Sequence, residues 1–85
     1  MSPTSPREGT ETVAGIGWMA RMIDKARLDA QGELAQFDLV YPCPMDRRLL
    51  EQLGIDGPAF QQVVLANETD EAIVAELQSR NLLPA

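Results

Sequence analysis

The sequence predicts an all-α fold, a compact bundle of about four short helices with the first helix at its centre. Apolar residues recur at helical spacing along residues 16–30. Three later segments each open with a helix-start signal and continue into apolar residues. The chain has 85 residues, of which 45% are hydrophobic, enough for one small core. We therefore expect a single helical domain over residues 13–85.

Residues 1–12 are expected to form a disordered N-terminal tail. They contain two prolines and several hydroxyl side chains, and no aromatic or branched aliphatic residue that could anchor them to a core. A segment of this composition buries too little apolar surface to offset the entropy lost on ordering.

The first helix is predicted over Ile16–Ala30, with Gly32 as its stop. One apolar stripe along it contains Ile16, Met19, Ala20, Ile23, Ala26 and Ala30. Trp18, Met22 and Leu28 lie off that stripe, so more than one side of the helix is apolar. A helix of this kind is usually packed between others, which makes it the central helix.

The second helix is predicted to start in the run Cys43-Pro44-Met45-Asp46. Proline suits the first helical turn because its missing N–H needs no partner there. The carboxylate of Asp46 lies near the positive end of the helix dipole, and Gly54 supplies a left-handed stop. The preceding connection, residues 33–41, is too apolar for a free linker and is expected to pack across the core.

Two further helices complete the predicted bundle. Asp56 caps the third helix, and Pro58 lies in its first turn. Thr69 caps the fourth helix, with Asp70 and Glu71 at its positive end. The connections between these helices are short, which favours packing of neighbouring helices against each other.

The composition excludes several kinds of site. With no histidine and a single cysteine, the sequence offers neither a Cys/His metal cluster nor an internal disulfide, and we expect no cofactor. No stretch approaches the roughly 18–20 apolar residues that span a bilayer, so no membrane partner is expected. The N-terminus does not read as a secretory signal, and a free thiol without such a signal favours a cytoplasmic location.

Charge excludes nucleic acid as a partner. Residues 49–63 have the spacing of a helix-turn-helix, with Gly54 in the turn. The net charge is −6, however, and residues 49–79 contain no lysine or arginine to replace phosphate counterions. The exposed Gln61 and Gln62 could read adenine, but nothing in this segment would offset repulsion from the phosphates. We interpret the spacing as a helix pair that simply packs.

Five polar residues form the candidate functional cluster: Asp24, Lys25, Arg27, Cys43 and Asp46. Cys43 lies at a helix N-terminus near two arginines, which favours a reactive thiolate, although a lone cysteine is also common as a small buried residue. Arg27 projects into the apolar stripe and needs a partner. It either pairs with Asp46 or joins Lys25 and the start of the second helix in an anion pocket.

Trp18, Leu82 and Leu83 are the candidate interface residues. Trp18 lies away from the main apolar stripe, on the side of Arg21 and Lys25. Exposed tryptophans are enriched at interfaces, and the alternative is that another helix covers the indole. Leu82 and Leu83 form a final apolar pair near the C-terminus.

Four motifs occur in a fixed order over most of residues 15–77: Arg21–Arg27, Cys43–Asp46, Leu53–Asp56 followed by Phe60, and Thr69–Glu71. In these motifs the chain resembles a bacterial family defined as domain of unknown function 5069. The resemblance implies a helical fold and marks the five residues of the candidate cluster as matched positions. The run Leu34-Ala35-Gln36-Phe37 departs from the family, which more often has a glycine after the leucine and an acidic residue before the aromatic.

The function expected from these features is a small non-catalytic helical module that acts through protein contact, with itself or another protein as partner. The alternative is a thiol- or anion-handling protein that uses Cys43 with Arg27, Lys25 and Asp46. None of the features predicts a particular reaction.

The charge pattern predicts that the protein does not bind duplex DNA at physiological salt. Fluorescence anisotropy with a random duplex should show no binding, because the helix pair that resembles a DNA reader has no cation. Micromolar binding that weakens steeply with added salt would contradict this expectation.

Overall fold

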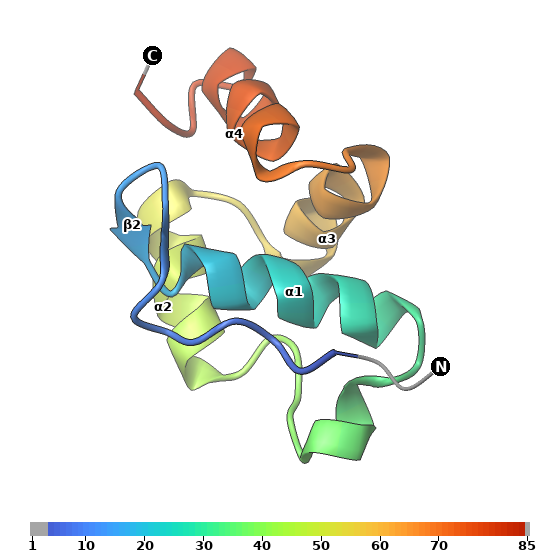
Figure 1. Ribbon diagram of the computed structural model, residues 1–85. Helices are drawn as coiled ribbons and strands as arrows, with labels where there is room; N and C mark the ends of the chain where they lie inside the picture. Colours follow the sequence, from blue (N-terminus) through green and yellow to red (C-terminus); the bar gives the residue numbers. More distant parts are fainter. Residues whose placement is uncertain (1–3, 85) are drawn as a thin grey trace.

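In the computed structural model, which describes residues 4–84, four α-helices and one short hairpin surround a single core (Figure 1). The elements in chain order are β1 (Thr12–Val13), β2 (Ile16–Gly17), α1 (Met19–Ala30), the 3₁₀ helix η1 (Leu34–Phe37), α2 (Pro44–Leu53), α3 (Gly57–Ala66) and α4 (Asp70–Ser79). The predicted mostly helical fold is confirmed. None of the described helices has the length and apolar character needed to cross a bilayer.

The predicted start of the first helix at Ile16 is wrong, because α1 begins at Met19. The preceding residues form an antiparallel hairpin in which Val13 pairs with Ile16. Its turn residues, Ala14 and Gly15, have φ of 55° and 75°, as in the turns that favour two-residue hairpins. Trp18 also has a positive φ, 73°, which separates the hairpin from the helix.

The predicted start signals of the later helices are confirmed. The Asp46 side chain accepts a hydrogen bond from the Cys43 backbone N–H at 2.9 Å, which completes a capping box on α2. At α3 and α4 the N-cap side chain is itself the acceptor: Asp56 accepts from the Ala59 N–H and Thr69 from the Ala72 N–H. Gly54 ends α2 with φ of 78°.

Helix α1 lies across the middle of the molecule, with α3 and α4 on one side and η1 on the other (Figure 1). Both of its apolar sides are buried. One side contributes Met19, Ala20, Ile23 and Ala26, and the other contributes Met22, Lys25 and Leu28. The core is completed from the other helices, mainly by Leu49, Leu50, Leu53, Phe60, Val63, Val64, Ile73 and Leu77. The first helix is therefore central, as predicted.

The connection between α1 and α2 packs on the core only in part. Leu34 in η1 is buried, whereas Phe37, Leu39 and Tyr41 are half-buried and Val40 is 65% exposed. The segment that was expected to cross the core instead runs along its edge.

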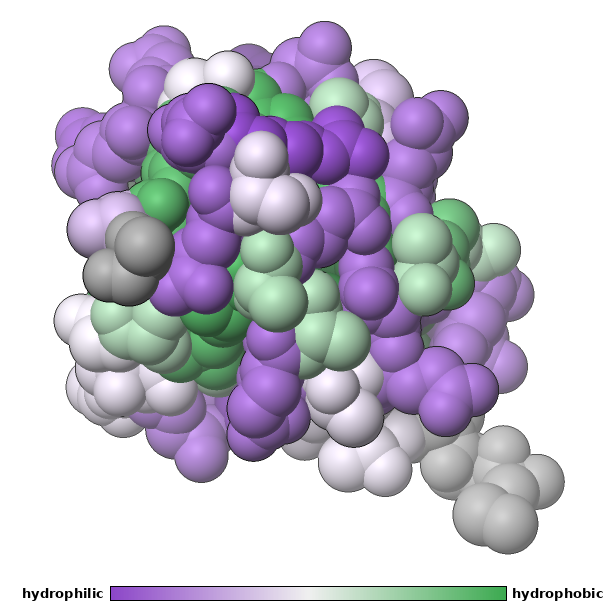
Figure 2. Space-filling view, turned by 90° about the horizontal axis from the view of Figure 1, so that it is seen from above, coloured by the Kyte–Doolittle hydropathy of each residue, from purple (hydrophilic) through white to green (hydrophobic). Residues whose placement is uncertain are grey.

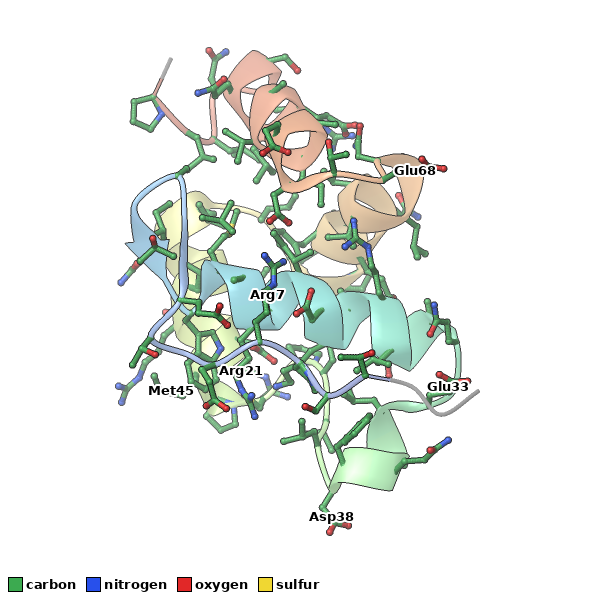
Figure 3. The ribbon with its side chains drawn as sticks, in the orientation of Figure 1. Arg7, Arg21, Glu33, Asp38, Met45 and Glu68 are labelled. Carbon is green, nitrogen blue, oxygen red and sulfur yellow. The ribbon has the colours of Figure 1, made fainter. Side chains whose placement is uncertain are left out.

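The N-terminal segment has an anchor that its apolar content does not reveal. Residues 1–3 of the expected flexible tail lie outside the described residues, but the Arg7 guanidinium bridges Asp24 on α1 and Asp70 on α4, at 2.9 Å and 2.7 Å (Figure 3). The Arg7 backbone N–H also donates to Asp24, at 2.8 Å. The hydrogen bond from Arg7 lowers the pKa of Asp70. The stability that the ionised Asp70 carboxylate contributes is thus present above the ordinary pKa of an aspartate. It is lost as pH falls through the lowered pKa of Asp70.

Replacing Ile23 with alanine should reduce the free energy of unfolding by about 2–4 kcal/mol, because the side chain is fully buried at the centre of α1. Denaturant unfolding followed by circular dichroism measures this change. Leu65→Ala is the matched control on an exposed face, since Leu65 is 57% exposed, and it should change stability by less than about 0.5 kcal/mol. Equal effects of the two substitutions would contradict the assignment of the core.

Candidate functional site

A buried ion pair joins α1 to the start of α2. Lys25 Nζ lies 2.6 Å from Asp46 Oδ2, and the two side chains are 1% and 0% exposed. Charged side chains are almost never fully buried unless they are paired. Each of these two charges therefore depends on the other.

Asp46 has two further donors. The indole Nε1 of Trp18 donates to Asp46 Oδ1 at 2.7 Å, and the Cys43 backbone N–H donates to Oδ2. A carboxylate at this third position of a helix also lies near the positive end of the dipole. The site is fully bonded, as no buried polar side-chain atom within residues 4–84 lacks a partner.

The position of Lys25 could have been found in the sequence. It lies three residues after Met22 and three before Leu28, on the second apolar side of α1. The cation predicted to pair with Asp46 was instead Arg27, which lies on the first apolar stripe. A lysine between two buried residues on one helix face was the available signal.

The predicted pair of Arg27 with Asp46 is wrong. Arg27 is half-buried, and its guanidinium donates to the backbone carbonyls of Asn67 and Glu68 at 3.1 Å and 3.2 Å. These carbonyls lie just after the last turn of α3, where a cation interacts favourably with the helix dipole. Arg27 therefore acts on α3, away from α2.

The five residues of the candidate cluster do not share a pocket. Asp24 and Arg27 line an open pocket of about 320 Å³ beside Thr4 and Ser5. Lys25 and Asp46 are sealed from solvent. Within the part of the chain that the structure describes, no group of three or more Cys, Asp or Glu residues is placed to hold a metal ion.

Trp18 is held in place on several sides. Its indole N–H donates to Asp46. The guanidinium carbon of Arg21 lies over the indole ring, 5.5 Å from the ring centroid. On Gly9, a Cβ would lie 2.5 Å from the Trp18 ring, so this position has no room for a side chain. The indole is thus a structural element of the first helix junction.

The other candidate interface residues offer little free apolar surface. Leu83 is 8% exposed and belongs to the core, and Leu82 packs partly against it. Seen from the α4 end, hydrophilic side chains cover much of the surface, and strongly apolar ones show mainly between them (Figure 2).

An exposed apolar surface lies elsewhere, on the residues that lead into α2. We define the 39–45 segment as Leu39-Val40-Tyr41-Pro42-Cys43-Pro44-Met45, a run without a charge. Val40 and Met45, at 65% and 45%, are two of the three strongly exposed large apolar side chains of the described chain. The signal in the sequence was seven consecutive uncharged residues, of which the first three, residues 39–41, were expected to pack across the core.

Tyr41 fixes this segment on the surface of α3. Its hydroxyl donates to the Gly57 carbonyl at 2.7 Å. Burial raises the pKa of Tyr41, and the negative charge of Asp46 raises it further. The hydroxyl therefore stays protonated and keeps this hydrogen bond at any physiological pH.

The family model of domain of unknown function DUF5069 matches residues 2–83. The chain belongs to this family. No curated protein matches it. In this DUF5069 chain, the motif residues Lys25 and Asp46 pair inside the core, and Arg27 binds the end of α3.

The buried pair predicts strong coupling between Lys25 and Asp46. Removing either partner, by Lys25→Met or Asp46→Asn, should cost about 3–5 kcal/mol because the other charge is left buried. The double variant should cost clearly less than the sum of the two. A domain of this size has only about 3–5 kcal/mol of stability, so unfolding should be measured in a stabilising osmolyte.

Arg27→Met provides the control cycle with Asp46→Asn. These two effects should add within about 0.5 kcal/mol, since Arg27 contacts α3 and not Asp46. Coupling between Arg27 and Asp46, or additivity between Lys25 and Asp46, would contradict the assignment.

Proposed function

We propose that this protein is a non-catalytic helical module that acts through protein contact, and that the 39–45 segment is its contact surface. The observation that carries the proposal is the division of side chains between interior and surface. The motif residues Lys25, Asp46 and Arg27 bind within the fold. In contrast, Val40 and Met45 of an uncharged run remain exposed. Apolar surface rimmed by polar residues is typical of interaction sites.

The segment has the properties of a preformed contact surface. The Tyr41 hydrogen bond and the capping box of α2 hold the second half of the segment in place, so little conformational entropy would be lost on binding. The adjoining Pro42 and Pro44 also restrict the backbone.

The thiol- or anion-handling alternative has less support. It requires Cys43, Arg27, Lys25 and Asp46 to converge on an accessible cavity. Asp46 and Lys25 are instead sealed from solvent and bonded to each other, and Arg27 binds the carbonyls after α3. Cys43 is half-buried and remains the one accessible residue of the cluster on α2.

A site-specific photo-crosslinker tests the proposed contact surface. With p-benzoylphenylalanine in place of Val40, the full chain in its native cells should give discrete cross-linked protein adducts. The same reagent at Leu65, a comparably exposed apolar position on α3, should give none. Met45→Asp should abolish the adducts from position 40, since it places a charge in the contact. No adduct from position 40, or equal adducts from both positions, would contradict the proposal.

A further inference from the structure

We infer that the partner of the 39–45 segment is a second copy of this chain, bound antiparallel across a twofold axis. This inference rests on the proposed function and adds the identity of the partner.

The segment has an acidic end and a basic end. Asp38 precedes it, and Arg47 and Arg48 follow it. All three side chains are exposed, and none takes part in an ion pair or a side-chain hydrogen bond within residues 4–84. Figure 3 shows Asp38 at the outer tip of the connection and Met45 apart from it at the start of α2. The three charges are therefore available to a partner.

A twofold axis near the middle of the segment makes these charges complementary. In an isologous dimer both copies use the same surface, so each contact between two different residues occurs twice. An antiparallel arrangement places Asp38 of each copy beside Arg47 and Arg48 of the other. A parallel arrangement would place like charges together, and like-charge contacts disfavour a complex.

Two open pockets lie beside the segment, one near each of its ends. One, of about 350 Å³, is lined by Leu34, Leu39 and Tyr41, next to the acidic end. The other, of about 470 Å³, is lined by Pro42, Leu50 and Ile55, next to Arg47. In the antiparallel arrangement, Met45 of one copy faces the first pocket of the other copy, and Val40 faces the second. The two strongly exposed large apolar side chains of the segment thus meet pockets with apolar walls, whose linings also include Asp29 in the first and Glu51 and Asp56 in the second.

The contact is small, so the dimer should be weak and dependent on concentration. Stable complexes commonly bury about 1,200–2,000 Å² in total, more than a seven-residue segment and two shallow recesses provide. The net charge of −6 also opposes self-association.

Complementary charge reversal gives the decisive test. Asp38→Lys makes both ends of the segment basic, and Arg47→Glu with Arg48→Glu makes both ends acidic. Each variant alone should self-associate at least about tenfold more weakly than the unmodified chain, because every end-to-end contact becomes a like-charge contact. An equimolar mixture of the two variants should associate again, since both contacts of the mixed dimer are complementary. Sedimentation equilibrium over a concentration series measures all three.

Glu71→Lys is the matched control. Glu71 is exposed on α4, away from the segment, and its substitution changes the net charge as Asp38→Lys does. This variant should associate as the unmodified chain does. Asp38 has φ of 54°, so a variant whose circular dichroism shows loss of helix is replaced by Asp38→Asn, which tolerates that conformation and should also weaken association.

The outcomes separate the two proposals. Association that is weakened in each variant and restored in their equimolar mixture would support the antiparallel dimer. A chain that stays monomeric at all concentrations, or variants that associate unchanged, would overturn it. If position 40 then still gives adducts to a different protein in cells, the contact surface stands and the second copy is excluded as its partner.

Discussion

Asp46 joins α1, the residue just before α1 and the start of α2. Its carboxylate, fully buried, accepts hydrogen bonds from Lys25 on α1, from Trp18 before α1, and from the backbone at the start of α2. A lone buried charge would be strongly unfavourable, so Lys25 and Asp46 must be buried as a pair. The crossing of α1 and α2, and with it the placement of the residues that lead into α2, depends on this one carboxylate.

Charged side chains position the remaining elements as well. Arg7 connects the N-terminal segment to α1 and α4 through two aspartates, and Arg27 binds the carbonyls after α3. In a domain with so small a core, such contacts fix the relative positions of elements that apolar packing alone would leave free to slide. A structural contact within the fold is thus made by each of the motif residues Asp24, Lys25, Arg27, Asp46 and Asp70.

The surface that remains for interaction follows from these constraints. The capping box at Cys43 and the Tyr41 hydrogen bond to α3 hold the connection against the outside of the bundle. Val40 and Met45 consequently point away from the core. The charges at either end of the segment, Asp38 and Arg47 with Arg48, are exposed and have no side-chain partner within residues 4–84. The second copy that we propose, in antiparallel orientation, would supply both the apolar contact and the counterions.

Local signals in the sequence determined the helices. Pro44, Asp56, Thr69 and Gly54 act through their own backbone geometry or through a bond to a residue three positions away, so the starts of α2, α3 and α4 and the end of α2 could be read directly. The periodicity of α1 likewise indicated its central place. What the tertiary structure alone decided was the choice of partners. Lys25 rather than Arg27 pairs with Asp46, and Arg7 reaches Asp70 across 63 residues, because such contacts depend on how the helices cross. No spacing along one helix encodes that crossing.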